Sequence, residues 1–285
     1  MEAAFAAVGA RVERIDLADC GFDTRSPSGL SLPVLGSRLP DAVHVRTLSA
    51  GSFEAVTKRL GVLHALEKLG VAVWNDARAI ERCVDKSMTS FLLGQAGVPT
   101  PPTWTMESGD VARALVEQEA PRGPLVLKPL FGAQGRGLRL IRRPEDLPAP
   151  EAIAGVYYLQ RFQANGAEDF TDYRLFVLHG RVIGAMMRRA STWITNVKQG
   201  GQPLAIAPDA KMERLAIAAA EAVGAKIAGV DVLVAADGGP TVLEVNSMPA
   251  WSGLQKVSRR NIAEAIASAL LDAWVRRGAS QRRAL

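Results

Sequence analysis

Hydrophobic residues recur at helical spacing in one long stretch of the first quarter of the chain. The repeating apolar positions are Val56, Leu60, Leu63, Leu66 and Leu69. Residues three or four apart share one face of a helix, so this stripe would face a core. Gly70 follows directly, and glycine commonly ends a helix. The spacing therefore predicts a helix over residues 53–69.

Short apolar runs alternate with helical stretches over the first 75 residues. The sequence predicts a helix at 3–8 and strands at 11–16, 43–46 and 71–74. A loop rich in glycine, serine and proline separates the first two strands. Alternation of strands and helices is typical of a parallel sheet with helices on its faces. We therefore interpret residues 1–75 as an α/β domain.

The remainder of the chain mixes helices with strands that follow one another directly. Asp85 suits the N-cap of a helix that ends at Gly97. Further helices are predicted at 111–119, 209–223 and 261–277. Further strands are predicted at 124–130, 138–143, 157–161, 173–178 and 182–188, with a hairpin at 230–246. We interpret this part as two α+β subdomains, at 76–155 and 156–285.

The composition narrows the class of protein. Hydrophobic residues make up 48% of the chain and charged residues 22%, which is typical of a globular protein. No stretch approaches the ~18 consecutive apolar residues of a membrane span. Cys20 and Cys83 lie far apart in the sequence and match no metal-binding or redox spacing. We therefore expect a cytoplasmic protein without a membrane segment.

The net charge of +5 gathers at the end of the chain. Residues 252–285 contain seven Lys or Arg and two Asp or Glu, so the other 27 basic and 27 acidic residues cancel. A basic segment of this kind could bind nucleic acid. A solvated helix with a cationic end accounts for the same charges, because cations are favourable at a helix C-terminus. We favour this second interpretation.

A glycine-rich turn joins two of the predicted strands and contains Gly132, Gly135, Arg136 and Gly137. Glycines let backbone N–H groups come close to a phosphate, and the arginine adds positive charge. A strand follows this turn, whereas P-loop and dinucleotide motifs need a helix there. The turn is therefore a candidate phosphate site, with a purely structural hairpin loop as the alternative.

Two lysines have surroundings that suit an anion. Lys128 lies among apolar residues on a predicted strand, where its ammonium group either reaches the surface or holds an anion in a cleft. Lys86 follows the N-cap Asp85, and a helix N-terminus favours phosphate. The alternative for Lys86 is a solvated lysine in the first turn.

The register of the predicted hairpin follows from its turn. Asp-Gly at 237–238 is a preferred centre of a two-residue turn. Paired residue numbers then sum to 475, which places Asp231 directly opposite Glu244. Asn246 shares their face of the sheet. The opposite face would carry Val232, Val234, Leu243 and Val245.

These three oxygen donors suit a cation. Two carboxylates so close together repel each other unless a cation or an arginine lies between them. Carboxylate and amide oxygens are the ligands that Mg²⁺ and Mn²⁺ prefer. The sequence therefore predicts a metal site at Asp231, Glu244 and Asn246.

A group of basic residues comprises Arg174, Arg188, Arg189 and Lys198, and Asn196 lies near them in the sequence. Scattered surface charge is the alternative to a shared site. Neighbouring residues on a strand point to opposite faces, so only one of Arg188 and Arg189 can enter a site, and we expect Arg188. The serines and cysteines have no nucleophile-like surroundings, so covalent catalysis by a side chain is not expected.

Taken in order, these features resemble the ATP-grasp superfamily and, within it, the RimK-type α-L-glutamate ligases. The resemblance runs from Val71 to the final helix. It rests on AIERCVDKSMTSFLLGQAGVPTP, LVLKPLFGAQGRGLRLI, YYLQRF, DYRLFV, AMMRRAS, GVDVLV and VLEVNSMPAWSG. It implies the ATP-grasp fold, in which an N-terminal α/β domain precedes two α+β subdomains that enclose ATP. It also implies an ADP-forming reaction: ATP phosphorylates a carboxylate, and an amine attacks the acyl phosphate.

The resemblance assigns roles to particular residues. Nucleotide contacts would come from Lys86, Lys128, Gly135, Gly137, Gln160, Arg161, Phe162, Asp172 and Asn196. Residues 160–162 match the hinge whose backbone reads adenine. Mg²⁺ or Mn²⁺ would be held by Asp231, Glu244 and Asn246. Arg174, Arg188 and Asn196 would be the catalytic residues that steady the acyl phosphate or the substrate carboxylates.

Residues 45–86 also resemble ligases that glutamylate the coenzymes tetrahydromethanopterin and methanofuran. The implied partners are L-glutamate and a small-molecule or peptide carboxylate acceptor, and a homo-oligomer stays open. The alternatives are a ligase for another acid and amine, including dipeptide or glutathione-like products, and a nucleotide-binding module without chemistry.

The chain departs from the pattern at three places. Arg161 stands where this family often has an acid, and Ile194-Thr195 replaces a more polar pair before Asn196. The strand and glycine-rich turn that normally open the N-terminal domain are not recognisable. Either this domain lacks its first strand or the given chain starts late. Gly229 stands where D-alanine ligases carry arginine, which counts against that relative.

Overall fold

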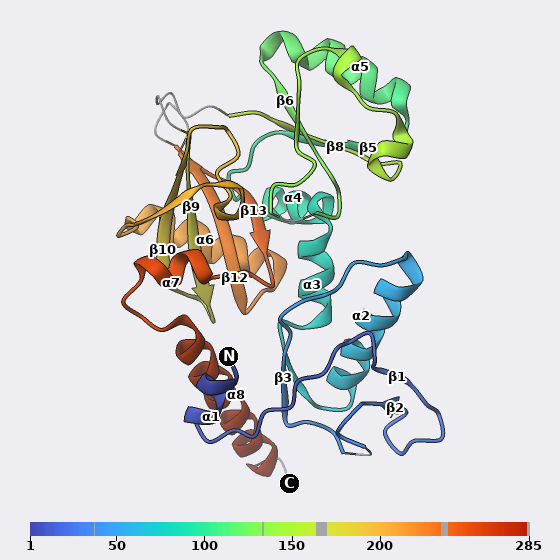
Figure 1. Ribbon diagram of the computed structural model, residues 1–285, viewed down its shortest axis with the longest axis vertical. Coiled ribbons are helices and arrows are strands. Elements are labelled where there is room, and N and C mark those ends of the chain that lie inside the picture. The colour runs from blue at the N-terminus through green and yellow to red at the C-terminus, as the bar shows by residue number, and fades with distance from the viewer. Residues whose placement is uncertain (37, 133, 164–169, 235–238, 284–285) are drawn as a thin grey trace.

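The computed structural model describes residues 1–36, 38–132, 134–163, 170–234 and 239–283, with the backbone alone over 277–283. Figure 1 shows three groups of elements along the long axis. A small sheet with its helix lies at the top, a larger sheet in the middle and the N-terminal elements at the bottom.

The N-terminal part contains a parallel pair of strands beside a long helix. Its elements are α1 (Glu2–Ala7), β1 (Gly21–Phe22), β2 (Leu30–Ser31), β3 (Ala42–His44), α2 (Phe53–Lys68) and β4 (Ala72–Trp74). β3 and β4 pair in parallel, as the alternation of strands and helices predicted. α2 starts at the N-cap Ser52 and packs Leu63 and Leu66 against Val73 and Ile80. The predicted apolar stripe is therefore confirmed at Leu60, Leu63 and Leu66, whereas Leu69 follows the end of the helix and is exposed.

Residues 11–16 do not form the predicted strand. Val12 is exposed and only Ile15 is partly buried. Arg11 forms an exposed ion pair with Glu13. A strand needs a partner edge for its backbone groups and a face to bury, and this segment has neither in the described part of the chain.

The small sheet has the strand order β5-β8-β6-β7. Its strands are β5 (Thr103–Met106), β6 (Leu125–Lys128), β7 (Arg139–Ile141) and β8 (Tyr157–Arg161). α5 (Gly109–Glu119) packs Ala112 and Val116 against Leu125, Leu127 and Leu159. We placed the subdomain boundary at residue 155, but β8, which follows that residue in the sequence, pairs within the small sheet.

Two helices connect the N-terminal part to the small sheet. α4 (Lys86–Gln95) begins at the predicted N-cap Asp85, whose carboxylate accepts hydrogen bonds from the backbone of Ser87 and Met88. α3 (Ala77–Val84) precedes it and was not predicted as a separate helix. Asp76 caps α3 in the same way.

The large sheet is antiparallel, in the order β11-β10-β9-β12-β13. Its strands are β9 (Phe170–Leu178), β10 (Arg181–Ala190), β11 (Gln202–Ala205), β12 (Ile227–Val234) and β13 (Pro240–Asn246). α6 (Ala210–Val223) covers one face, where Ala216 and Val223 share a core with Leu175, Val177 and Val230. Successive side chains point to opposite faces, so Asp172, Arg174 and Asp231 lie on the face away from α6.

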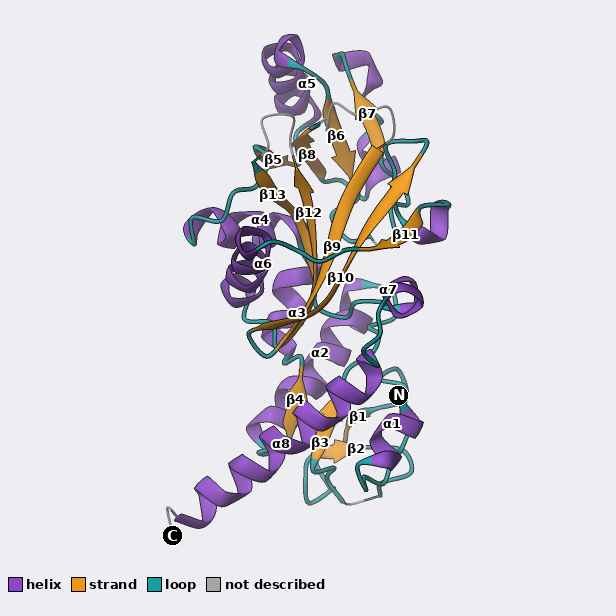
Figure 2. Ribbon diagram, turned by 90° about the vertical axis from the view of Figure 1, so that its left-hand side faces the viewer, coloured by secondary structure: helices purple, strands orange, loops and turns teal. Residues whose placement is uncertain are grey.

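The far end of that second face is closed by the last two helices. Phe176 and Met186 share a core with Leu254 of α7 (Ser252–Val257) and with Ile266 of α8 (Ile262–Arg283). Met1 and Phe5 pack into the same cluster, so α1 lies against α8 (Figures 1 and 2). α8 extends to Arg283, beyond the predicted end at residue 277.

Asn75 ties the N-terminal part to the large sheet. Its Nδ2 donates hydrogen bonds to the carbonyls of Ile227 and Ser247, both at 2.6 Å. Its Oδ1 accepts hydrogen bonds from the backbone of Lys226 at 2.7 Å and of Ile227 at 2.9 Å. The side chain is only 1% exposed. Four buried hydrogen bonds therefore fix the start of β12 and the end of β13 against the residue that follows β4.

Candidate active site

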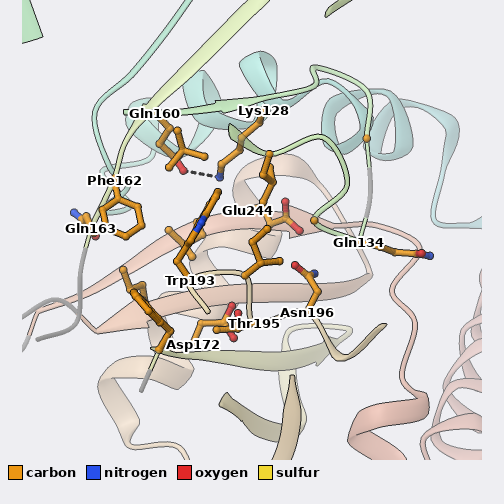
Figure 3. Close-up of a pocket in the computed structure, with 18 of the residues that line it drawn as sticks. Lys128, Gln134, Gln160, Phe162, Gln163, Asp172, Trp193, Thr195, Asn196 and Glu244 are labelled. Atoms are coloured by element: carbon orange, nitrogen blue, oxygen red, sulfur yellow. Dashed lines mark hydrogen bonds between the residues drawn. The ribbon is translucent and has the colours of Figure 1, made fainter. Parts of the chain in front are cut away.

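A cleft lies between the small and the large sheet (Figure 3). It measures about 950 Å³ including the part that opens to solvent. The predicted site residues that line it are Lys86, Lys128, Gly135, Gln160, Arg161, Phe162, Asp172, Asn196 and Glu244. The predicted residues outside its lining are Gly137, Arg174, Arg188, Asp231 and Asn246. Most of the predicted nucleotide contacts thus converge from segments far apart in the sequence.

Two partly buried ammonium groups lie at one end of the cleft. Lys86, the first residue of α4, donates to the carbonyls of Leu130 at 3.3 Å and Gly132 at 2.8 Å. Lys128 at the end of β6 donates to Oε1 of Gln160 at 2.6 Å (Figure 3). Burial lowers the pKa of both lysines, although the charge of Glu244 opposes this shift. Partly buried cations held by neutral acceptors are suited to an anionic ligand.

The glycine-rich turn closes against the segment that carries Asn196. Gly135 has a φ of 69°, in the left-handed region. A Cβ atom there would overlap Oδ1 of Asn196 and lie 2.9 Å from Nε2 of Gln199. Gln199 also donates to the carbonyl of Gln134 at 2.7 Å. The turn needs glycine at this position because two segments meet there.

The predicted hinge separates inward-facing and outward-facing side chains. Gln160 is buried, and its Oε1 accepts a hydrogen bond from Lys128. Arg161 forms an ion pair with Glu119 at 2.6 Å, on the side of α5. Phe162 meets Trp193 edge to face, with ring centroids 6.0 Å apart. The two rings give the cleft an aromatic wall (Figure 3).

A buried ionic network lies next to the cleft, on the face of the large sheet away from α6. Arg174 donates from Nε and Nη2 to the two oxygens of Asp231, both at 2.6 Å. Arg188 makes a two-point contact with Asp172 and approaches Asp231 at 3.0 Å. Three of these four residues are at most 5% exposed, and Arg174 has a side-chain exposure of 12%. Two guanidinium groups therefore neutralise the charge of Asp231.

The network shifts the protonation of its members. Burial alone would raise the pKa of Asp231, but Arg174 and Arg188 outweigh it and lower that pKa to about 2. The two aspartates raise the pKa of Arg188 despite its burial. Burial raises the pKa of Asp172, although the charge of Arg188 opposes this shift. Asp231 and Arg188 both stay charged near neutral pH, so they form a fixed pair of buried charges.

The hairpin pairs Asp231 with Glu244, as the register predicted. The register differs from the prediction after this pair, because a β-bulge follows Asp231 and Val232 pairs with Val242 instead of Leu243. The predicted turn at 237–238 lies outside the described residues. The bulge corrects one assignment: Leu243 lines the cleft, and Val242 takes its place in the core under α6.

Glu244 lies close enough to Lys86 and Lys128 for its charge to act on both of their pKa values. Asn246 donates from Nδ2 to Glu244 at 3.0 Å and to the carbonyl of Gly229 at 3.3 Å. Glu244 lines the cleft (Figure 3). Within the described residues, no three His, Cys, Asp or Glu side chains gather closely enough to hold a metal. The predicted metal ligands are not a cluster of this kind, because they comprise two acids, Asp231 and Glu244, and the amide of Asn246.

The remaining basic residues are not gathered at the cleft. Arg189 and Lys198 are exposed, on β10 and in the segment after Asn196. Trp193 and Thr195 line the cleft, and the sequence reasoning did not select them. Their one available signal was position, because both lie within three residues of Asn196.

A comparison with known families identifies the segment that carries this cleft. The family model of the RimK-like ATP-grasp domain matches residues 83–270, about two thirds of the chain. The chain belongs to the RimK-like ATP-grasp family. The matched range begins just before Lys86, spans both sheets and ends within α8.

Curated relatives within this family are ligases. A tetrahydromethanopterin:α-L-glutamate ligase of Methanococcus maripaludis is 37% identical over 212 residues, covering 72% of this chain and 71% of that protein. The protein of the same name from Methanosarcina acetivorans is 31% identical over 259 residues, covering 79% and 78%. A probable α-L-glutamate ligase of Pseudoalteromonas translucida is 34% identical, covering 80% and 79%. The prediction of an ATP-grasp ligase is therefore confirmed.

Solved structures share the fold. The ATP-grasp ligase PsnB complexed with a minimal precursor, Mg and ADP has a TM-score of 0.70 at 22% identity, covering 95% of this chain and 92% of that chain. A D-alanine–D-alanine ligase from Bacillus anthracis has a TM-score of 0.58 at 20% identity, covering 78% and 76%. The predicted ATP-grasp fold is thus confirmed. Across the described residues, no helix has the length and apolar character needed to cross a bilayer.

Proposed function

We propose that the protein joins L-glutamate to a carboxylate of tetrahydromethanopterin or a chemically similar coenzyme, with ATP and Mg²⁺ or Mn²⁺. An oxygen of the acceptor carboxylate attacks the γ-phosphorus of ATP, and ADP leaves. The amine of glutamate then attacks the acyl carbon, phosphate leaves, and the amine loses a proton. The names of the relatives at 31–37% identity support this choice of substrates.

The nucleotide would lie in the cleft between the sheets. Lys86 and Lys128 are partly buried cations in positions to contact phosphates. The glycine-rich turn offers backbone N–H groups beside them. Phe162 and Trp193 supply an aromatic wall at the other side for the adenine ring (Figure 3). The cleft therefore matches both the charged and the apolar end of ATP.

The donor set fits a divalent cation at Glu244 and Asn246. Glu244 faces the two lysines across the cleft, and Asn246 keeps its Oδ1 without a donor among the described residues. Asp231 lies at the paired position on β12, but both of its oxygens accept hydrogen bonds from arginine. Asp231 would therefore join the metal only by exchanging an arginine contact. The metal would screen the phosphates and orient them.

Arg174 and Arg188 would serve the carboxylate side of the reaction. They lie next to the cleft, with Asp172 and Asp231 holding their guanidinium planes in place. Fixed positive charge at this place would stabilise the negative charge that develops on the acyl phosphate. Direct contact with a substrate needs one of the present carboxylate contacts to be replaced.

The observation that carries the proposal is the convergence of Lys86, Lys128 and Glu244 on one cleft in a RimK-like chain. The test incubates the protein with MgATP, L-glutamate and tetrahydromethanopterin, and measures ADP and the mass of the product. We expect ADP release to depend on both substrates and the product to gain one glutamyl residue. Glu244→Gln should abolish turnover, whereas Glu145→Gln, at an exposed acid in the small subdomain, should not.

The outcome also separates the alternatives. ADP release with another acid or amine from a panel, and none with glutamate, would indicate a ligase for different substrates. Tight binding of ATP without turnover for any pair would indicate a nucleotide-binding module. Either result contradicts the proposed reaction.

A further inference from the structure

Arg46 lies where a ligand of the N-terminal part would be expected. It follows β3 by two residues, at the carboxyl end of a parallel strand pair. In open α/β sheets, ligands bind beyond the carboxyl ends of the strands. The guanidinium lies 3.9 Å from the centre of the Trp251 ring and donates from Nη1 to the carbonyl of Pro249 at 3.2 Å. Both contacts are with the segment that follows β13.

The guanidinium of Arg46 has no acidic partner among the described residues. Arg161, Arg174 and Arg188 each meet a carboxylate at 2.6 Å or less. Arg46 instead has a ring and one carbonyl, although a guanidinium offers five N–H donors. Burial lowers its pKa, and no nearby acid opposes this effect. A partly buried cation without a counter-charge is costly unless an anion joins it.

The residues that contact Arg46 connect it to the face of the large sheet that carries Arg174. Pro249 packs against Gly229, where a Cβ atom would lie 2.8 Å from Pro249 and 3.6 Å from Nε of Arg174. Asn246 donates to the carbonyl of Gly229. Arg46 is absent from the lining of the nucleotide cleft. It therefore lies beyond Arg174, on the side away from the proposed ATP site.

We propose that Arg46 binds the side-chain carboxylate of the incoming L-glutamate. This inference rests on the proposed function. Both carboxylates of glutamate stay ionised through the reaction, so each needs a cationic or hydrogen-bonding partner. The α-carboxylate shares a carbon with the attacking amine and stays near Arg174. The side-chain carboxylate lies farther along the molecule, where Arg46 supplies a fork of donors held by Trp251.

The choice of amino acid follows from this contact. Glutamine has nearly the shape of glutamate but cannot accept two charge-assisted hydrogen bonds on one ionised group. A site built around an unpaired guanidinium therefore prefers glutamate, because glutamine leaves the buried charge unneutralised.

The test compares Arg46→Gln with the unaltered protein in the glutamate ligation assay. Loss of a hydrogen-bonded charge pair should raise KM for L-glutamate about 10- to 100-fold. KM for ATP should stay within about twofold, because Arg46 is outside the nucleotide cleft. The preference for glutamate over glutamine should fall by a similar factor. Arg46→Lys keeps the charge and should recover part of that preference. Arg11→Gln, at an exposed arginine of the same part of the chain, should change nothing.

Three results would overturn the assignment. The first is an unchanged ratio of glutamate to glutamine use, with both KM values and the melting temperature shifted together, which indicates a purely structural role. The second is a higher KM for the acceptor alone. The third is full activity of Arg46→Gln. If the unaltered protein ligates no glutamate at all, the proposed function fails instead, so the two failures are distinguishable.

Discussion

Removal of the Asn75 amide should loosen the joint between the N-terminal part and the large sheet. Asn75→Ala deletes four buried hydrogen bonds and leaves two carbonyls and two N–H groups without partners. At about 1 kcal/mol net for each bond, the free energy of unfolding should fall by about 4 kcal/mol. This is a large share of the roughly 5–15 kcal/mol that stabilises a typical domain.

Urea denaturation followed by tryptophan fluorescence and circular dichroism measures this loss. The matched control is Asn261→Ala, an exposed residue whose Oδ1 accepts two longer hydrogen bonds at 3.1 and 3.3 Å. It should lose only about 1 kcal/mol. Asn75→Asp keeps the accepting oxygen but places a second one against two carbonyls, so its deficit should shrink as acid protonates it. Equal losses in Asn75→Ala and Asn261→Ala would refute the reasoning.

Three other expectations concern single groups. Burial lowers the pKa of His44 to about 4 from its usual 6.5, so the unfolded chain binds the proton first and stability falls as pH drops from 6.5 towards 4. Between pH 7 and 5, the free energy of unfolding should fall by about 2 kcal/mol more for the unaltered protein than for His44→Leu; equal falls would contradict this. Burial raises the pKa of the Cys83 thiol to about 12, so a thiol reagent should label Cys83 only after unfolding, and rapid labelling of the native protein would disprove it. Gly135→Ala should weaken MgATP binding about 10-fold in calorimetry through its clash with Asn196. Gly200 also has a positive φ but open space around it, so Gly200→Ala should bind nearly normally; similar losses in both would point to backbone strain alone.

Local patterns predicted most of the elements. Helical spacing located α2, and N-cap chemistry placed the start of α4 at Asp85. Such signals depend on residues close in sequence, which act before tertiary packing. The strand predicted at 11–16 does not form, because a short local pattern cannot supply a partner strand. β11 was missed because its burial depends on β10, a nonlocal contact.

The hairpin shows which part of a strand register local sequence can predict and which part it cannot. Turn chemistry gave the pairing of Asp231 with Glu244, which the structure confirms. The bulge beside that pair moved Leu243 into the cleft, and nothing local in an alternating strand announces an extra residue. The prediction was therefore right at the carboxylates and wrong at one neighbour.

The buried ionic network lay beyond sequence reasoning altogether. Glu244 and Asp231 could be paired from one hairpin, but Arg174 and Arg188 reach Asp231 only through the alignment of β9 and β10 with β12. β9 and β10 are joined by a tight turn, but β10 ends at Ala190 and β12 begins only at Ile227, so the alignment depends on a nonlocal contact. The sequence identified these charged residues as candidates, and the sheet decides which of them meet. Their catalytic and metal-binding roles stay predictions.

The packing of α1 against α8 has a consequence for how the chain acquires its structure during synthesis. Phe5 shares a core with Ile266, and 261 positions separate them in the sequence. At ~5–20 residues per second, a ribosome needs roughly 13 to 50 s to cover that distance. The ring of Phe5 can meet His44 early in synthesis, but the surface that α8 offers to Met1 and Phe5 is absent until nearly the whole protein has been made. The earliest segment to leave the ribosome is therefore among the last to complete its packing, and a chain cut short before α8 would leave part of it exposed to chaperones and proteases.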